Sequence, residues 1–412
     1  MLSKTFCILP WTHAATYTDG TALLCCVAKA QPNHCDLNTQ TLKQVWNGHL
    51  FKSTRLKMLR GEEVDNCAAC YEEEAMGINS HRLVENYIWY KRLGKEYVNN
   101  LINNTRQDGS VPHDLITLDL RLGNTCNLQC VMCRPIDSSK WVKHATVLSE
   151  ELTTDAKYDW QGKIDEFSVK NFEWYKDQEF LDSFYESASG IQHIIFGGGE
   201  PLYIKEHKEI IKQLVNRGHS KNIELRYHTN GTIWDQEVAD LWTQFKRVEV
   251  MISIDGHGKV NDYIRYPSDW ATIEKNLQLY DNSPDPIDPK ILCTVQALNI
   301  AYLPEFADWI QAQNYKKISK RSQEGIFHAG VLHYPLYLSP KVLPKKTKEY
   351  ITEKLGAYAN AHLNNGHIQK FKHLTELMNS EDLEFMLDQT IEYTQKLDSL
   401  RNTDSDFFRK LI

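Results

Sequence analysis

One short segment constrains this chain more than any other. Cys126, Cys130 and Cys133 lie within eight residues, in the spacing C-x3-C-x2-C, directly after an apolar run at 115–120. A loop this short can place three thiolates around one iron–sulfur cube, whereas protein clusters are normally held by four cysteines. The missing fourth cysteine predicts a cluster with one iron left open for a substrate or cofactor. Structural zinc and buried free thiols are the alternatives, but zinc usually needs a second C-x2-C pair or added histidines, which this loop lacks.

A second group of cysteines lies in residues 1–85, which contain six of the ten in the chain. An Asp-Gly pair between two β-rich runs predicts a hairpin that brings Cys7 and Cys25 close together on a two-stranded ribbon. Cys67 and Cys70 form a C-x2-C pair further along. The ribbon and the C-x2-C pair together supply four thiolates, which is enough to ligate a second cluster completely. A structural zinc site with four cysteine ligands is the alternative.

The middle of the chain alternates between strand and helix patterns. Strands are expected at 115–122, 191–197, 222–228, 247–254, 290–297 and 326–333. Amphipathic helices between them are clearest at 204–217, 236–245, 270–280 and 303–313. This alternation predicts an α/β fold with a parallel sheet and helices outside it. In parallel α/β barrels, chemistry gathers where the strands end.

Polar and glycine residues follow those strand ends. A Gly-Gly-Glu-Pro run at 198–201 follows the second strand, and glycines there let the backbone approach a ligand closely. Ser253 and Asp255 alternate to one face of the fourth strand, and Arg265 follows with a planar fork of donors. The alternatives are an ordinary turn for the glycines, a core hydroxyl for Ser253 and a surface charge for Arg265.

The three-cysteine loop followed by Gly-Gly-Glu-Pro resembles the radical S-adenosylmethionine (SAM) superfamily. The resemblance implies a partial (β/α)6 radical SAM barrel and a [4Fe-4S] cluster on Cys126, Cys130 and Cys133, whose open iron is chelated by SAM. One electron would then cleave SAM to a 5′-deoxyadenosyl radical, which abstracts a hydrogen atom from the substrate. The residues implied to contact SAM are Met132, Gly198, Gly199, Glu200, Pro201, Asn230, Ser253, Asp255, Arg265 and Asn299. Met132 stands where the family usually has an aromatic residue.

The N-terminal cysteines resemble the twitch domain, the shorter relative of the SPASM domain of many radical SAM enzymes. Cys7, Cys25, Cys67 and Cys70 fit its pattern one by one, with Cys25 rather than Cys26 at the required distance after a glycine. The resemblance implies an auxiliary [4Fe-4S] cluster that accepts an electron from the substrate radical or anchors the substrate. This module usually follows the catalytic core, whereas here it precedes the core.

These patterns divide the chain into four parts. We expect a twitch-like domain at 1–85, a helical linker at 86–114, a radical SAM barrel at 115–335 with an insertion at 137–175, and a C-terminal helical extension at 336–412. Aromatic residues in the insertion are expected to pack as core.

The resemblance implies a maturase that modifies a peptide, with a radical SAM dehydrogenase (oxidoreductase) of a small alcohol or sugar as the alternative. A non-catalytic iron–sulfur or zinc protein is the rival of another class. The expected partners are a one-electron reductant such as flavodoxin or ferredoxin and a peptide or small-molecule substrate. A net charge of -7 predicts no nucleic-acid binding, and the absence of a long apolar run predicts no membrane span. Ten cysteines without an export signal predict a reducing, cytoplasmic location.

Overall fold

The computed structural model describes residues 3–29, 35–75, 77, 79–112, 115–161, 170–318, 326–362 and 365–412. It divides into two compact units. The first unit comprises Met1–Asn124, Asn171–Arg226 and Gln244–Arg247, and the second comprises Thr125–Lys170, Tyr227–Thr243 and Val248–Ile412. The four domain boundaries expected from the sequence stay predictions.

The strands of the first unit combine an N-terminal hairpin with a parallel sheet. Their order is β2 (Ala22–Leu23), β1 (His13–Thr16), β3 (Thr117–Arg121) and β4 (His193–Gly197). β1 and β2 are antiparallel, and the turn between them has Gly20 at φ +86°, a conformation that glycine adopts without steric cost. The hairpin expected from the Asp-Gly pair is therefore confirmed. β1 also pairs in parallel with β3, which in turn pairs in parallel with β4.

One part of the hairpin prediction is wrong. Cys7 does not lie on the ribbon, because the short helix α1 (Leu9–Thr12) separates it from β1. Pro10 lies in the first turn of that helix, where its fixed φ favours a helix start. Cys25, in contrast, lies two residues after the end of β2.

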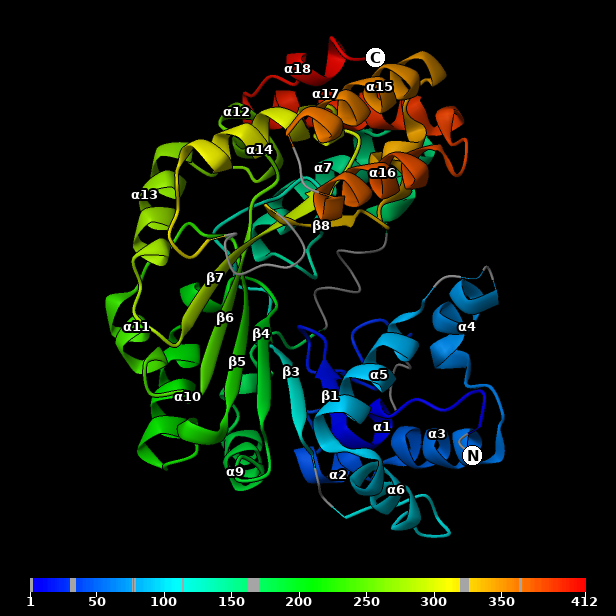
Figure 1. Cartoon of the computed structure of the whole chain (residues 1–412), viewed down its shortest axis with the longest axis vertical. Helices are drawn as coiled ribbons and strands as arrows, with labels where there is room; N and C mark the ends of the chain where they lie inside the picture. The colour runs from blue at the N-terminus through cyan, green and yellow to red at the C-terminus, as the bar shows by residue number, and fades with distance from the viewer. Residues whose placement is uncertain are drawn as a thin grey trace. The chain divides into compact units, whose positions relative to one another are not determined.

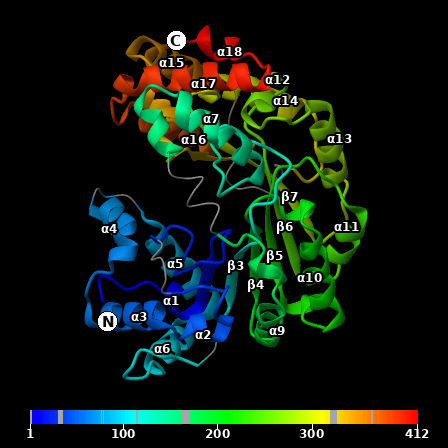
Figure 2. The ribbon, with the colours of Figure 1, turned by 180° about the vertical axis from the view of Figure 1, so that it is seen from behind.

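Further helices complete the described part of the first unit. Helix α2 starts with a reciprocal capping box between Thr41 and Gln44, and Gly48 separates it from α3. Figures 1 and 2 show α1 to α6 grouped around β1. The helices are α2 (Leu42–Trp46), α3 (His49–Arg60), α4 (Ala68–Ala75), α5 (His81–Leu93), α6 (Lys95–Asn103), α9 (Gln178–Ser187) and α10 (Lys205–Asn216). Short 3-10 turns are η1 (Asp65–Cys67), η4 (Trp174–Lys176), η5 (Pro201–Tyr203) and η6 (Ser220–Asn222).

The second unit contains the remaining parallel strands. β5 (Glu224–Thr229) carries the chain from the first unit into the second, which holds β6 (Arg247–Ser253), β7 (Ile287–Val295) and β8 (His328–Val331) in that order. β6 pairs in parallel with β7, and β7 with β8. All six strands expected in the middle of the chain are present, so the α/β fold with a parallel sheet is confirmed.

Helices of the second unit fall into two groups. Figures 1 and 2 show α13 and α14 along the outer side of β7, whereas α15, α16 and α17 gather beside α7. The helices are α7 (Val142–Glu151), α11 (Gln236–Trp242), α12 (Lys259–Ile264), α13 (Trp270–Asp281), α14 (Leu303–Ala312), α15 (Lys345–His362), α16 (Asn365–Asn379), α17 (Leu387–Arg401) and α18 (Asp406–Arg409). Short 3-10 turns are η2 (Ser139–Trp141), η3 (Asp155–Asp159), η7 (Ile300–Tyr302), η8 (Leu336–Leu338), η9 (Pro340–Val342) and η10 (Glu384–Met386).

The insertion at 137–175 packs mainly through its aromatic side chains. Trp160 is buried in the second unit, and Trp174 and Tyr175 are buried in the first. Tyr158 is an exception, with 60% of its surface exposed, and Phe172 is only partly buried. The expected core role is confirmed for the three buried residues, while residues 162–169 lie outside the described part.

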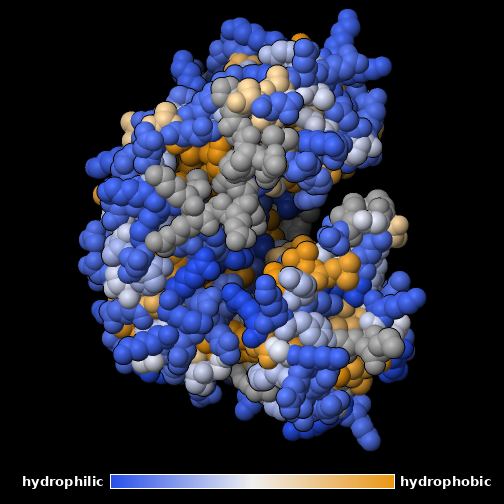
Figure 3. Space-filling model, in the orientation of Figure 1, coloured by the Kyte–Doolittle hydropathy of each residue, from blue (hydrophilic) through white to orange (hydrophobic). Residues whose placement is uncertain are grey.

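Hydrophilic residues dominate the face of the molecule drawn in Figure 3, as 25% charged residues would lead one to expect. Among the described helices, none combines the length and the apolar character needed to cross a bilayer.

Candidate cofactor sites

The three-cysteine segment forms a buried loop, residues 126–133, which we call the cysteine loop. Cys126 and Cys130 are buried, and Met132 and Cys133 pack against them. The Cys133 amide donates to the Cys130 carbonyl (3.0 Å), which closes a turn between these two cysteines. A hydrogen bond from the Cys133 thiol is the main reason why the pKa of Cys130 is lowered. All three thiols of the motif therefore belong to one compact, buried structure.

Side chains from outside the loop, two of them from the far end of the second unit, hold the backbone of the cysteine loop. Four consecutive carbonyls, those of residues 128–131, each accept a hydrogen bond from a side chain outside the loop. The donors are Ser138 Oγ to Leu128 (2.6 Å), Arg401 Nη2 to Gln129 (2.6 Å), Trp141 Nε1 to Cys130 (3.0 Å) and Tyr393 OH to Val131 (2.8 Å). The amides of Gln129 and Val131 donate to carbonyls of the segment after α12, Tyr266 and Ile264. Buried backbone groups are thus satisfied without regular secondary structure.

Hydrogen-bond donors also approach the sulfur atoms. Asn230 Nδ2 lies 3.9 Å from Cys126 Sγ, and Arg265 Nη1 lies 3.9 Å from Cys130 Sγ. Donors directed at sulfur stabilise thiolates and tune the potential of iron–sulfur clusters. Three thiols in one loop with such donors are the ligand set of a cluster that has one iron without a protein ligand. The residues therefore fit the [4Fe-4S] cluster expected from the sequence.

Three of the residues expected to contact SAM form a buried network at the ends of β6 and β7. Arg265 Nε lies 2.9 Å from Asp255 Oδ2, and the Asp255 carboxylate also accepts from the Thr294 amide at 2.7 Å. Asn299 Nδ2 donates to the carbonyls of Asp255 and Thr294, at 2.8 and 2.9 Å. Burial raises the pKa of Asp255, while the Arg265 guanidinium opposes that rise. Asp255 thus orients Arg265 within the chain, and direct contacts of either residue with SAM stay predictions. Ser253, the last residue of β6, is partly buried.

The Gly-Gly-Glu-Pro run adopts a turn that only glycine tolerates at its first position. Gly198 has φ +104°, and a Cβ added there would lie 2.7 Å from the Gly123 carbonyl oxygen. The Gly199 amide donates to that same oxygen at 3.0 Å. Glu200 is buried, and its carboxylate accepts from the Leu202 amide at 3.1 Å, which caps η5 beginning at Pro201. The turn therefore ties the end of β4 to the segment after β3.

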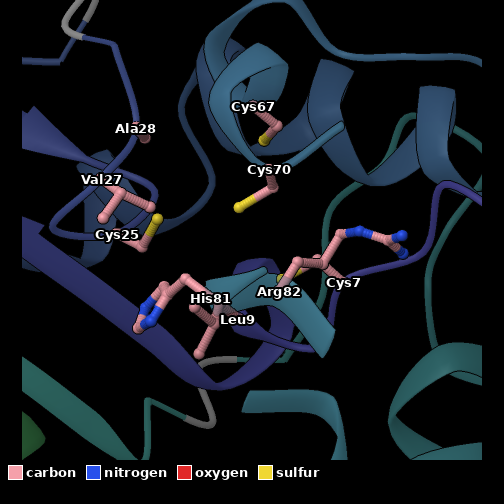
Figure 4. Close-up of a pocket in the computed structure, with 9 residues that line it drawn as sticks. All are labelled: Cys7, Leu9, Cys25, Val27, Ala28, Cys67, Cys70, His81 and Arg82. Carbon is pink, nitrogen blue, oxygen red and sulfur yellow. The ribbon is translucent and has the colours of Figure 1, made fainter. Parts of the chain in front are cut away.

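The four N-terminal cysteines gather around one cavity in the first unit, which we call the four-cysteine pocket. Figure 4 shows the sulfur atoms of Cys25, Cys67 and Cys70 directed into this space, with Cys7 behind Arg82. The lining is completed by apolar and basic residues: Leu9, Val27, Ala28, His81 and Arg82. Cys26 is exposed, and its Sγ lies 3.8 Å from His81 Nε2, whereas Cys35 is buried away from this lining.

Asparagine side chains bring the separate segments of the pocket together. Lys29 and Asn66 bond reciprocally, from the Lys29 amide to the Asn66 carbonyl (2.9 Å) and from Asn66 Nδ2 to the Lys29 carbonyl (2.7 Å). This pair joins the segment after Cys25 to the C-x2-C pair. Asn86 on α5 accepts from the Ile8 amide (2.8 Å) and donates to the Phe6 carbonyl (3.0 Å), which fixes the segment that carries Cys7.

The donor set of the pocket suits a fully ligated iron–sulfur cluster. Burial raises the pKa of each of the four cysteines, so cluster binding must release thiol protons. Within the described ranges, no three or more His, Cys, Asp or Glu side chains are arranged to hold a single metal ion. Four thiols around one cavity fit a larger group, and four cysteines are the usual ligands of a cube.

Some residues at these sites were not expected from the sequence. Tyr393 and Arg401 contact the cysteine loop from α17, and His81 and Arg82 line the four-cysteine pocket from α5. Neither pair belongs to a motif. The sequence pointed only to helices of the C-terminal extension at 336–412 for the first pair and to the twitch-like domain at 1–85 for the second, and to no contact of either pair with a site.

Comparison with known proteins agrees with the fold and with both cysteine sites. Residues 120–283 match the radical SAM superfamily, and residues 7–71 match SPASM, described as an iron–sulfur cluster-binding domain. The radical SAM match covers 164 of the 412 residues and the SPASM match covers 65. The chain therefore contains a radical SAM domain and, before it in the sequence, an SPASM domain. The cofactors of these domains are a [4Fe-4S] cluster, SAM and auxiliary iron–sulfur clusters.

Individual relatives are distant. The sporulation killing factor maturation protein SkfB of Bacillus subtilis (strain 168) is 27% identical over 150 residues, which are 36% of this chain and 28% of that protein. Histidine-tagged anSMEcpe with bound AdoMet aligns at 18% identity and TM-score 0.38, over 58% of this chain and 59% of that one. Streptococcus suis SuiB bound to precursor peptide SuiA aligns at 14% identity and TM-score 0.35, over 72% of this chain and 59% of that one. The chain thus spans less than two thirds of each of these proteins.

Proposed function

We propose that this enzyme cleaves SAM reductively and modifies a peptide by radical chemistry. The observation that carries the proposal is the cysteine loop, which presents three thiols, and no fourth cysteine, beside the sulfur-directed donors Asn230 and Arg265. The peptide is supported by the names of two similar proteins, a maturation protein and an enzyme crystallised with a precursor peptide.

Cys126, Cys130 and Cys133 would hold the catalytic cluster. When bound, this [4Fe-4S] cluster supplies the electron that cleaves SAM to a 5′-deoxyadenosyl radical, which abstracts a substrate hydrogen. The chain's own contribution is to keep the loop rigid, because four loop carbonyls are bonded by side chains from outside it. Rigid ligands and surrounding donors hold the potential and the geometry of such a site constant.

SAM would be held by groups that match its own charges. The turn at 198–201 would receive the methionine ammonium with backbone carbonyls and Glu200, and the Arg265 fork would receive the carboxylate. Met132 would cover the adenine. Asn230, Ser253, Asp255 and Asn299 would complete the contacts, with Asp255 acting partly through Arg265, to which it is ion-paired.

Cys7, Cys25, Cys67 and Cys70 would hold the auxiliary cluster. With four protein ligands, no iron of that cluster is open to substrate, which favours an electron acceptor over a substrate anchor. The expected external reductant is a flavodoxin or ferredoxin.

The test begins with anaerobic reconstitution of the full chain, addition of SAM and reductant, and measurement of 5′-deoxyadenosine. We expect formation that depends on the cysteine loop, with Cys35→Ala as a control that retains activity because Cys35 lies at neither site. Iron-loaded protein that binds SAM but forms no 5′-deoxyadenosine would overturn the proposal. A short peptide encoded beside the gene is then added, and a mass change in that peptide tests the substrate class.

A further inference from the structure

The final long helix of the second unit reaches the cysteine loop through two side chains. Tyr393 and Arg401, both on α17, donate to the carbonyls of Val131 and Gln129, at 2.8 and 2.6 Å. Tyr393 is fully buried, and Arg401 is 6% exposed.

Arg401 is a buried cation with unusually little to stabilise its charge. Its guanidinium carbon lies 4.8 Å from the Trp141 ring centroid and 4.9 Å from that of Tyr266, so it is held between two aromatic rings. Only Nη2 makes a hydrogen bond, while Nε and Nη1 are buried without a partner in the described part of the chain. Among the described residues, no carboxylate forms an ion pair with it. Burial lowers the pKa of Arg401, and Cys130 is one of the groups that counter this effect.

Such a charge is costly to bury unless an anion lies nearby. Aromatic faces offset part of the desolvation cost, but they do not replace a counter-charge. A cluster ligated by thiolates is anionic and gains a further negative charge on reduction. Since the bonded carbonyl belongs to Gln129, next to Cys130, the guanidinium lies in the immediate surroundings of the loop thiols.

We propose that Arg401 is a positioning residue that orders the cysteine loop and supplies positive charge that favours reduction of its cluster. This inference rests on the proposed function only in requiring that the loop holds a cluster. Net charge and hydrogen bonding are the protein's main means of setting cluster potentials. Tyr393 shares the ordering role but carries no charge, so the two residues separate the mechanical effect from the electrostatic one.

The experiment is potentiometry of the reconstituted full-length enzyme, followed by electron paramagnetic resonance. The catalytic cluster is identified as the one whose signal changes when SAM is added. Arg401→Met and Arg401→Gln both remove the charge, and at least one is expected to fold because the first suits the two rings and the second retains a donor. Either should lower the midpoint potential so that the one-electron reduction constant falls at least tenfold, which corresponds to about 59 mV.

Three comparisons make the result specific. Arg401→Lys should recover most of the lost potential, because it restores the charge without the planar fork. Tyr393→Phe should leave the potential unchanged but release iron faster to a chelator. Arg55→Gln is the matched control, since Arg55 is a buried arginine of the first unit with four hydrogen bonds, and it should not change this potential.

An unchanged potential in a folded, iron-loaded, charge-removing variant would overturn the inference. A potential that falls equally in Tyr393→Phe would also overturn it, because loop order alone would then explain the effect. If the wild-type loop holds no SAM-responsive cluster, the proposed function itself fails, and that outcome is visible before any variant is made.

Discussion

The two cysteine sites of this protein are built in opposite ways. The cysteine loop takes all of its thiols from eight consecutive residues, whereas the four-cysteine pocket collects them from residue 7 to residue 70. Side chains from outside the loop enclose it, whereas the pocket forms only where segments far apart in the sequence come together. A contiguous motif thus determines which ligands a site has, and tertiary structure determines its surroundings. Under the proposed function, three thiols would leave one iron open for SAM, while four would leave none.

The two sites also differ in whether the arginines beside them have carboxylate partners. Arg82 beside the four-cysteine pocket is ion-paired with Glu74. Near the cysteine loop, Arg265 is ion-paired with Asp255, but Arg401 has no carboxylate partner in the described ranges. Among the described residues, the loop thus has a neighbouring arginine without a carboxylate partner, whereas the arginine beside the pocket is ion-paired.

The largest expected effect on function follows from removing a thiol of the cysteine loop. Cys126→Ala, Cys130→Ala or Cys133→Ala should reduce SAM cleavage below detection, because each removes a ligand of the cluster with the open iron. Iron content should fall from about eight to about four per chain, since each cube contains four irons. Chromatography of 5′-deoxyadenosine with iron analysis checks this. A variant that cleaves SAM at the wild-type rate would show that the catalytic site is elsewhere.

Removing two pocket thiols should separate product formation from SAM cleavage. In Cys67→Ala/Cys70→Ala, Cys7 and Cys25 cannot hold a cube alone, so iron should again fall to about four per chain. SAM should still be cleaved, but finished peptide product should be absent because the electron acceptor is missing. Mass spectrometry of the peptide beside 5′-deoxyadenosine measures both. Completed turnover in a folded variant would mean that the pocket is structural.

A smaller effect is expected where charge is kept but geometry is lost. Arg265→Lys should weaken SAM binding, because an ammonium cannot reproduce a bidentate fork or maintain the contact with Asp255 in the same geometry. Hydrogen bonds to charged groups contribute on the order of 1.5–3 kcal/mol, so the dissociation constant should rise by roughly ten- to 150-fold. Calorimetric titration of reconstituted protein with SAM gives this constant. Unchanged affinity would remove Arg265 from the SAM site.

The smallest expected effect concerns a single neutral bond to the loop. Tyr393→Phe removes the hydroxyl that donates to Val131 and nothing else, which should lower the free energy of unfolding by about 1–3 kcal/mol, because a buried carbonyl loses its partner. Thermal unfolding of the iron-loaded protein measures the change. Tyr350→Phe, which removes a hydroxyl from a tyrosine of the same unit that is 53% exposed, serves as the control and should have little effect.

Much of the fold could be predicted because its signals are local. The strand and helix patterns of the middle of the chain, the turn at Gly20 and the run at 198–201 each depend on residues that are neighbours in sequence. The candidate ligands of the cysteine loop could be named for the same reason, whereas those of the four-cysteine pocket were named from the resemblance to the twitch domain. The position of Cys7 was predicted wrongly because a short helix, started by Pro10, breaks what otherwise resembles one ribbon.

By itself, the sequence determined the class of protein, the strands of the core and the thiols available to each site. Tertiary structure alone decided what surrounds them: the parallel pairing of β1 with β3, the asparagines that join the pocket, and the contact of α17 with the cysteine loop. The physical reason is range. Periodicity and spacing act over a few residues, whereas Arg401 lies 272 residues from the Gln129 carbonyl that it binds, and only the packing of the whole second unit brings the two together.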